Sequence, residues 1–292
     1  MKKLLSIFFI ILFFSCSKKN ENDLPRLLVP EQENVVEVNS KEMLNVSLGV
    51  EGRNLASNFI NDTVLKDEFE YEKYEKFYTL IKNRDTILPK YKFEVKIDTS
   101  YTIASKGFQF KNIKKPSQDF VIVNGKYLGG KTPNAQQKEK FEKEYDKYFK
   151  DIFEQEKKYI KCYPLLIYND ENKVSFIKSI KLIQEAKDAD GQWKPIEFFM
   201  PTPSCVGYSV FFKFNPKQYQ AISIIKYNGQ FKTKLRAKVK INDYYYYSNE
   251  IIGFINQSQF NTTKVKEEIL FMKPNFTTDY LEEYLNFTFL KD

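Results

Sequence analysis

The stretch FKTKLRAKVKI, Phe231–Ile241, alternates between two kinds of side chain along its whole length. Every second residue is apolar or small, and the residues between them are all basic: Lys232, Lys234, Arg236, Lys238 and Lys240. Successive side chains of a β-strand point to opposite faces, so the pattern predicts a strand with one apolar face and one basic face. The cations would stand at intervals of about 7 Å. Such a row suits an anionic polymer, but a solvated face that discourages edge-to-edge pairing has the same pattern.

Four consecutive tyrosines, Tyr244–Tyr247, follow this stretch after the turn signal Asn242-Asp243. In a strand, Tyr244 and Tyr246 face one way and the other two face the opposite way. One pair is therefore expected outside the core or at an edge, where rings can stack on sugars or on another protein. Alternatively, one pair lies in the core and the other covers a neighbouring strand. The candidate ligand face comprises the five cations together with Tyr244 and Tyr246.

Short strand-like segments separated by turn residues continue on both sides of this stretch. Between Tyr163 and Phe260 they recur at regular spacing, which predicts an immunoglobulin-like β-sandwich domain over residues 162–262. Residues 35–131 form a predicted β-rich N-terminal region. There, the alternation from Tyr91 to Ile97 indicates a half-buried strand, and Asn124-Gly125 indicates a hairpin. The predicted fold class is therefore mainly β.

One long amphipathic helix is predicted within residues 132–161, covering about 133–158. Thr132 suits an N-cap, and Pro133 is tolerated at the first helical position. A stripe of large apolar residues then recurs at helical spacing: Phe141, Tyr145, Tyr148, Phe149, Ile152 and Phe153. We expect this stripe to pack on the protein's own sheet, the alternative being insertion into a groove of a partner.

The C-terminal extension, residues 263–292, has two predicted elements. A strand is predicted around Glu268–Met272. A short helix is predicted after it, because Asp279 and Glu282 have the spacing of a capping box.

The N-terminus has the pattern of an export signal over residues 1–15. Lys2 and Lys3 precede a largely apolar segment, Leu4–Phe14, that is too short to cross a membrane as a helix. Ser15 and Cys16 then close the segment, which resembles a bacterial lipoprotein signal, whose cysteine is acylated. The resemblance implies a lipid on Cys16, a flexible tether over residues 16–34 and a location at the outer membrane or cell surface. The alternatives are a cleaved secretory signal and a structural segment.

A second resemblance covers about Ile180–Phe260. The pieces WKPIE at Trp193–Glu197, FKTKLR at Phe231–Arg236 and SNEIIGFIN at Ser248–Asn256 are similar to uncharacterised surface lipoproteins of the Bacteroidota type. The polar tether after Cys16 also resembles the tethers of that group. The resemblance implies surface location and a β fold, and it implies no particular activity.

Composition excludes several classes of site. The chain has no histidine, which excludes a histidine general base, serine and cysteine triads, and zinc sites that need imidazole. With Cys16 acylated, only Cys162 and Cys205 remain, so a four-thiolate metal site is also excluded. These two form either one disulfide or two separate buried thiols. No cofactor is expected.

Charge points to the class of partner. The formal net charge is +8, and residues 159–260 hold fourteen Lys and Arg against eight Asp and Glu. Such a field favours acidic polysaccharide or lipid headgroups, and nucleic acid is not expected for an exported protein. The predicted function is a lipid-anchored, non-catalytic binding or scaffolding module of the cell envelope, with a glycan, an anionic envelope polymer or a partner protein as its ligand.

Two other functions compete with this prediction. The first is a glycosidase that needs no histidine, because carboxylates lie near the β segment: Glu185, Asp188, Asp190, Glu197 and Glu250. Asp188 and Asp190 stand in a predicted turn, where Asp is favoured for backbone reasons. The second is a purely structural envelope component.

Overall fold

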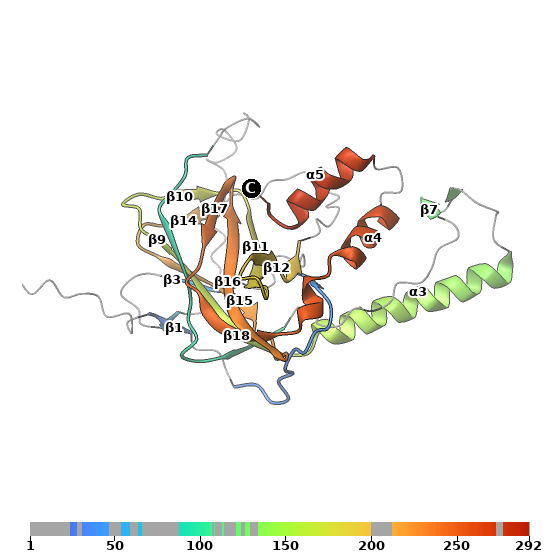
Figure 1. The fold of residues 1–292 in the computed structure, drawn as a ribbon, viewed down its shortest axis with the longest axis horizontal. Helices are drawn as coiled ribbons and strands as arrows, with labels where there is room; N and C mark the ends of the chain where they lie inside the picture. Colours follow the sequence, from blue (N-terminus) through green and yellow to red (C-terminus); the bar gives the residue numbers. More distant parts are fainter. Residues whose placement is uncertain are drawn as a thin grey trace, which may run out of the picture.

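Two sheets packed face to face form the body of the protein (Figure 1). The structure is a computed structural model, and it describes residues 24–27, 31–46, 54–58, 64–65, 88–106, 108, 113, 121–123, 126–128, 134–199, 212–272 and 277–291. The mainly β fold class is confirmed.

The first sheet is built around β16 (Phe231–Ile241), the stretch with the strict alternation. On one edge β16 pairs with β11 (Ile180–Lys187), which in turn pairs with β12 (Trp193–Pro195). On the other edge β18 (Ile251–Ile255) pairs with the first half of β16, and β17 (Tyr244–Tyr247) pairs with the second half. All these pairings are antiparallel, and we call this the β16 sheet.

The second sheet has β9 (Ile160–Asn169) at its centre, between β15 (Tyr219–Ile225) and the edge strands β5 (Phe93–Ile97) and β6 (Ile103–Ser105). β3 (Asn54–Asn58) pairs with the far edge of β15. The predicted half-buried strand is confirmed, because Phe93, Val95 and Ile97 are buried. The sheet thus joins strands from residues 35–131 to strands from residues 162–262, across the division that the sequence suggested.

The core lies between the two sheets. Its fully buried side chains come from both of them and include Leu165, Ile167, Ile222, Leu182 and Val239. Full burial of one such side chain contributes about 1.5–3 kcal/mol, so this interface is the main source of stability.

Short strand pairs surround the two sheets. β1 (Arg26–Leu27) with β4 (Val64–Leu65), and β2 (Leu44–Asn45) with β13 (Glu197–Phe198), are parallel. β7 (Val121–Val123) with β8 (Lys126–Leu128), and β10 (Ser175–Ile177) with β14 (Phe212–Phe214), are antiparallel. The β7–β8 pair confirms the predicted hairpin, since Val123 pairs with Lys126 across the two residues Asn124-Gly125.

The segment Ser248–Asn256 fastens the two sheets to each other. The Ser248 hydroxyl accepts from the Ala237 N–H at 2.8 Å. The Asn249 side chain reaches the other sheet, where it accepts from the Ile97 N–H at 2.7 Å and donates to the Ile97 carbonyl at 3.2 Å. At Gly253 a Cβ atom would stand 2.2 Å from the end of the Leu235 side chain, which would have to move to admit it. The piece SNEIIGFIN therefore has a structural role.

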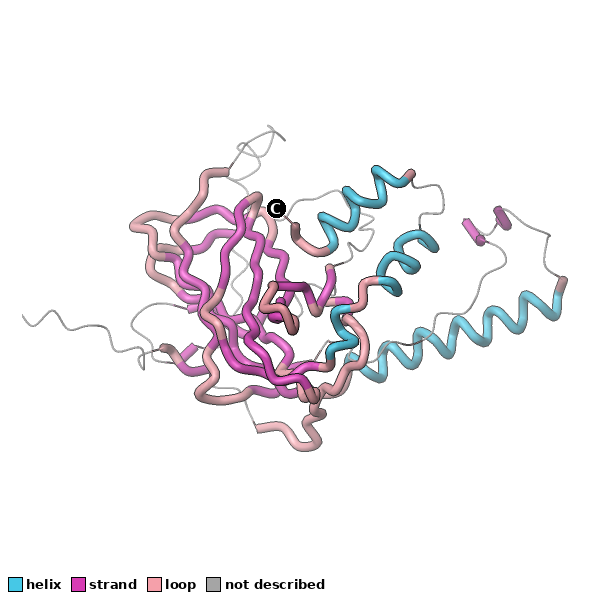
Figure 2. Tube along the Cα trace, viewed as in Figure 1, coloured by secondary structure: helices cyan, strands magenta, loops and turns pink. Residues whose placement is uncertain are grey.

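Helices of the described residues lie to one side of the sheets (Figure 2). They are α3 (Ala135–Glu156), the 3-10 helix η1 (Gln257–Phe260), α4 (Thr263–Met272) and α5 (Thr278–Thr288). The long helix predicted at about 133–158 is present as α3, but the described residues hold three α-helices and not one, because α4 and α5 accompany it. None of the helices in the described ranges combines the length and the apolar character needed to cross a membrane.

The predicted strand at Glu268–Met272 is also wrong, since these residues are the second half of α4. Val265 and Ile269 stand four residues apart and are buried against Met43, Phe198 and Leu285. This i, i+4 contact is typical of a helix. The short apolar run ILFM fits a strand equally well, so the sequence pattern did not indicate the helix.

The caps of the helices differ from those predicted. α3 begins two residues later than expected, with Asn134 as its N-cap: the Asn134 side chain accepts from the Gln137 N–H at 2.9 Å, and the Gln137 side chain accepts from the Asn134 N–H at 2.9 Å. The predicted helix after residue 277 is confirmed, but its N-cap is Thr277 and makes no side-chain cap bond. Asp279 instead lies in the first turn, where its negative charge interacts favourably with the positive end of the helix dipole.

α3 projects away from the sheets (Figure 1). Its rings contact one another along the helix, as with Tyr145 and Phe149, whose centroids are 4.9 Å apart. Phe149 and Phe153 are 40% and 56% exposed. For these two residues, the prediction that the stripe packs on the protein's own sheet is wrong.

The Asn249 contact can be tested by stability. We expect Asn249→Ala to lower the free energy of unfolding by about 1 kcal/mol, because it removes two hydrogen bonds and leaves the edge of β5 unsatisfied. Urea denaturation measures this. Asn172→Ala, at an exposed turn, is the matched control and should leave stability unchanged. Equal stability of the two variants would contradict the role of Asn249.

Candidate functional site

Cations and aromatic rings alternate across the outer face of the β16 sheet. We call this row the cation–aromatic ladder, and its members in order are Lys187, Trp193, Arg236, Tyr247, Lys238, Tyr245 and Lys240. The register of the strands places them there: Lys187 lies opposite Trp193, Lys238 opposite Tyr247, and Lys240 opposite Tyr245. Partners opposite each other in antiparallel strands share a face, so each ring stands between two cations.

The contacts of the ladder are close. The Arg236 guanidinium carbon is 4.2 Å from the centroid of the Trp193 ring and 4.2 Å from that of Tyr247. Lys238 Nζ is 4.8 Å from the Tyr245 centroid, and Lys187 Nζ is 5.1 Å from the Trp193 centroid. The face of an aromatic ring attracts a cation within about 6 Å. This attraction allows like charges to stand on one sheet face.

Two carboxylates neutralise part of the ladder. Glu185 accepts from Arg236 Nε and Nη2, both at 2.7 Å, and its other oxygen lies 3.9 Å from Lys238 Nζ. Glu250 lies 2.7 Å from Lys234 Nζ and 3.9 Å from Lys187 Nζ. The Lys234 contact holds the pKa of the Glu250 carboxyl below its usual value. The expectation that a single basic face stands in solvent is wrong at Lys238, which is only 6% exposed.

The tyrosines that join the cations are not the predicted ones. Tyr244 pairs with Ile241 and Tyr246 with Val239, so both point to the inner face. The Tyr246 hydroxyl donates to the Tyr91 carbonyl at 2.9 Å, and burial raises the pKa of Tyr246 to about 12. The two-residue turn Asn242-Asp243 sets this register and was the signal in the sequence that could have assigned the faces. No comparable signal marks Trp193, because its position beside Arg236 depends on two long-range pairings, β12 with β11 and β11 with β16.

The C-terminal residues cover one end of this face. Leu290 is buried against Ile183 and Val46. Lys181 Nζ lies 3.8 Å from the centroid of the Phe287 ring. At the other end, which we call the accessible end of the ladder, Lys187 and Arg236 contact Trp193, and exposed Lys232 and Lys234 continue the same face along β16.

The cysteine predictions fall largely outside the described residues. Cys162 is buried in β9, and Cys205 and Cys16 lie in parts of the chain that the structure does not describe. The disulfide and the lipid therefore stay predictions.

Comparison with known proteins gave no match. Neither a protein-family model, nor a curated protein, nor a solved structure matched this chain. The site must therefore be interpreted from its own geometry.

A cleft of about 310 Å³ opens along the edge of β18, next to the accessible end of the ladder. Its lining includes the apolar residues Ile225, Leu235 and Ile251 and the charged residues Glu37, Lys161 and Lys226. Its volume lies at the lower end of the range for ligand pockets, about 300–1,000 Å³. We call it the β18 cleft.

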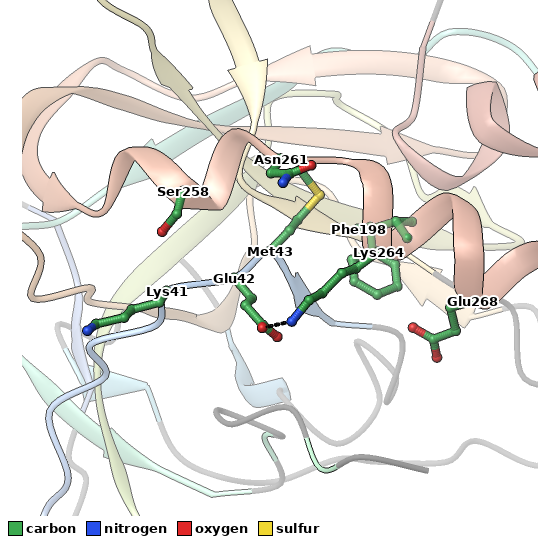
Figure 3. Close-up of a pocket in the computed structure, with 9 residues that line it drawn as sticks. Lys41, Glu42, Met43, Phe198, Ser258, Asn261, Lys264 and Glu268 are labelled. Carbon is green, nitrogen blue, oxygen red and sulfur yellow. Dashed lines mark hydrogen bonds and ion pairs between the residues drawn. The ribbon is translucent and has the colours of Figure 1, made fainter. Parts of the chain in front are cut away.

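A smaller cleft of about 130 Å³ lies between α4 and the segment before β2 (Figure 3). Lys264 reaches from α4 to the Glu42 carboxylate and forms an ion pair with it. Met43, Phe198 and Val265 provide the apolar lining. The cleft is well below the usual volume of a ligand pocket.

Four of the five carboxylates considered for a glycosidase, Glu185, Asp188, Glu197 and Glu250, are bonded to neighbouring groups of the protein. Glu197 is buried and accepts from the Gln184 N–H, the Gln184 side chain and the Tyr227 hydroxyl, each at 2.8 Å. Asp188 accepts from the Gln192 and Asp190 N–H groups in a turn. The contact with Lys194 also lowers the pKa of Asp188, which is opposite to what a general acid requires. In the described parts of the chain, no group of three or more Cys, Asp or Glu is arranged to hold a metal ion.

Lys181 gives a testable pH dependence. Burial, and then the neighbouring Lys240, lower the pKa of Lys181 to about 8. The charged form therefore destabilises the folded state fully below pH 8, and this effect disappears as pH rises toward the unfolded pKa of about 10.4. We expect Lys181→Met to be more stable than wild type at pH 7 by about 1 kcal/mol, after allowance for solvent screening.

Urea denaturation at pH 7 and pH 10 measures the difference. The gain should shrink at pH 10, because Lys181 is then mostly neutral in the folded wild type. Lys178→Met, at an exposed position, is the control and should show no gain at either pH. A gain of the same size at both pH values would rule out the charge as its cause.

Proposed function

We propose that this protein is a lipid-anchored, non-catalytic binding module of the cell envelope, and that the accessible end of the ladder binds an acidic polysaccharide. One observation carries the proposal: exposed Lys232 and Lys234 share a sheet face with Lys187 and Arg236, which contact Trp193, and among the described residues the ion pairs of these cations are made with Glu185 and Glu250. We retain the immunoglobulin-like assignment of the sandwich as part of the proposal. Its support is the pair of packed sheets.

The ladder suits a polymer of repeating charge. Lys232 and Lys234 are spaced at the repeat of strand β16, so carboxylates along a chain can meet them in turn. Side-chain rings at the same face offer apolar surface to the sugar rings. Arg236 is held by Glu185 and its side chain is only 22% exposed, whereas Lys187 and Lys234 share a single carboxylate, Glu250. We therefore assign the ligand's charges to Lys232, Lys234 and Lys187.

The proposed anchor is a lipid on Cys16, followed by the tether over residues 16–34. Support comes from the pattern of residues 1–16 alone. Several acyl chains together give stable membrane attachment, since each buried methylene contributes about 0.8 kcal/mol. The proposed location is the outer membrane or cell surface.

Binding can be tested with two double variants of equal charge. We expect wild-type protein to bind polygalacturonate at low salt and to lose affinity as salt rises, because the interaction is electrostatic. Lys232→Glu with Lys234→Glu should weaken binding at least tenfold. The matched control is Lys140→Glu with Lys143→Glu on α3, where both lysines are exposed, and its affinity should stay within twofold.

Surface-immobilised polygalacturonate with soluble protein provides the measurement, with neutral dextran as the second ligand. Equal losses in the two double variants would show that net charge alone drives binding. Absence of wild-type binding to polygalacturonate at low salt would overturn the proposal.

The anchor has its own test. We expect Cys16→Ala to move the protein from the membrane fraction to the soluble fraction, because the acylation site is lost. Cys162→Ala should leave the fractionation unchanged. Retention of the Cys16→Ala protein in membranes would contradict the lipid anchor.

A further inference from the structure

The outer face of β18 is apolar where it adjoins the accessible end of the ladder. Ile252 and Phe254 point to this face and are 55% and 46% exposed, while Ile251 and Ile255 are buried on the inner face. A strand with one face in water normally places polar residues there. Strand β16 follows this rule with its lysines, and β18 departs from it. Exposed apolar side chains that adjoin polar ones often mark a binding surface.

The register places each of these apolar side chains directly beside a lysine. Phe254 lies opposite Lys232, and Ile252 lies opposite Lys234, in the antiparallel pairing of β18 with β16. Side chains opposite each other share a face, with Cβ atoms about 4.5–5.5 Å apart. Along each strand the spacing on one face is about 7 Å. We call these four residues the lysine–apolar array.

The positive charge of the array is only partly neutralised. Glu250 lies 2.7 Å from Lys234 Nζ, and it is shared with Lys187, whose Nζ lies 3.9 Å away. Lys232 is exposed, and none of the carboxylates in the described ranges lies within ion-pair distance of it. The array therefore combines available positive charge with available apolar surface.

This combination restricts what can cover the array. A second copy of this chain, placed face to face, would bring the lysines of both copies together, and like charges in contact weaken binding. A purely apolar ligand would bury the lysines without partners, which is also costly. A purely acidic polymer would cover the lysines and leave Ile252 and Phe254 in water. The ligand that fits carries negative charges and apolar groups side by side.

We propose that the lysine–apolar array selects acidic polysaccharides whose sugars carry acyl groups. This inference rests on the polysaccharide binding proposed above and names the class of ligand for the same face. Carboxylates of the polysaccharide bind Lys232 and Lys234, while acyl groups on the same or adjacent sugars pack on Phe254 and Ile252. The short distance between a lysine and its apolar neighbour suits two substituents carried by one sugar or by adjacent sugars.

The test compares two polymers that differ only in acylation. Polygalacturonate with sparse butyryl esters on its hydroxyl groups keeps every carboxylate, and unmodified polygalacturonate is the reference. We expect the soluble protein to bind the immobilised butyrylated polymer at least fivefold more tightly, because each buried methylene raises affinity about fourfold. The ratio should persist at high salt, which screens charges but not apolar contacts. Butyrylated dextran, which has no charge, should bind at least tenfold more weakly than butyrylated polygalacturonate.

A double variant separates the apolar contact from the charges. Ile252→Gln with Phe254→Gln should abolish the preference for the butyrylated polymer and keep the affinity for unmodified polygalacturonate within twofold. The matched control is Phe149→Gln with Phe153→Gln on α3, where the two rings are 40% and 56% exposed, and it should retain the preference. Urea denaturation checks that both double variants are folded.

The outcomes distinguish this inference from the proposed function. Equal affinity of wild type for the two polymers would overturn the inference and leave the proposed function standing, whereas absence of binding to either polymer would overturn both. A preference that survives in the Ile252 and Phe254 variant would place the acyl contact elsewhere on the protein.

Two further results would also contradict the inference. Equal weakening of both polymers in the Ile252 and Phe254 variant would show that these side chains contact the sugars themselves. Tighter binding to phosphatidylglycerol vesicles than to the butyrylated polymer, lost in the same variant, would make this face a membrane contact.

Discussion

Strand β16 is the constraint on which the rest of the structure depends. Because it pairs along both edges, its inner residues must fill the core while its outer residues stand on a sheet face that carries five cations. The inner set, with Leu235 and Val239, meets the β9 sheet. The outer set is tolerated because rings from β12 and β17 separate the cations and Glu185 bonds to Arg236. The register of β16 with its neighbouring strands thus both fills the core and supplies partners for the outer cations.

Periodicity in the sequence predicted the parts of the fold that depend on local pattern. The strands Phe93–Ile97 and Phe231–Ile241, the β7–β8 hairpin and the helix at α3 have strict alternation, a turn pair or a helical stripe. Long-range pairing leaves no such local pattern in the sequence. The pairing of β5 with β9 joins residues some seventy positions apart in the sequence. Helix α4 was missed for a different reason: a run of four apolar residues fits a strand equally well.

The sequence predicted the cations of the candidate site but not its aromatic rings. Alternation correctly placed the cations on one face, since that needs only the geometry of a single strand. The rings were assigned wrongly, because the register between β16 and β17 decides which tyrosines share the face of the cations, and this register was not known from the sequence. Trp193 and Glu185 reach Arg236 from β12 and β11, and no local pattern reveals that three separate strands converge on one guanidinium.

The segment Val36–Val38 has a mechanical consequence. The Val36 carbonyl accepts from Lys161 in β9, and the Val38 carbonyl accepts from Asn228, just after β15. The segment runs parallel to both partners. A pull on the preceding residues would load these bonds together, in shear, instead of peeling them one at a time. Tension on residues 31–35 would therefore pass directly into the β9 sheet.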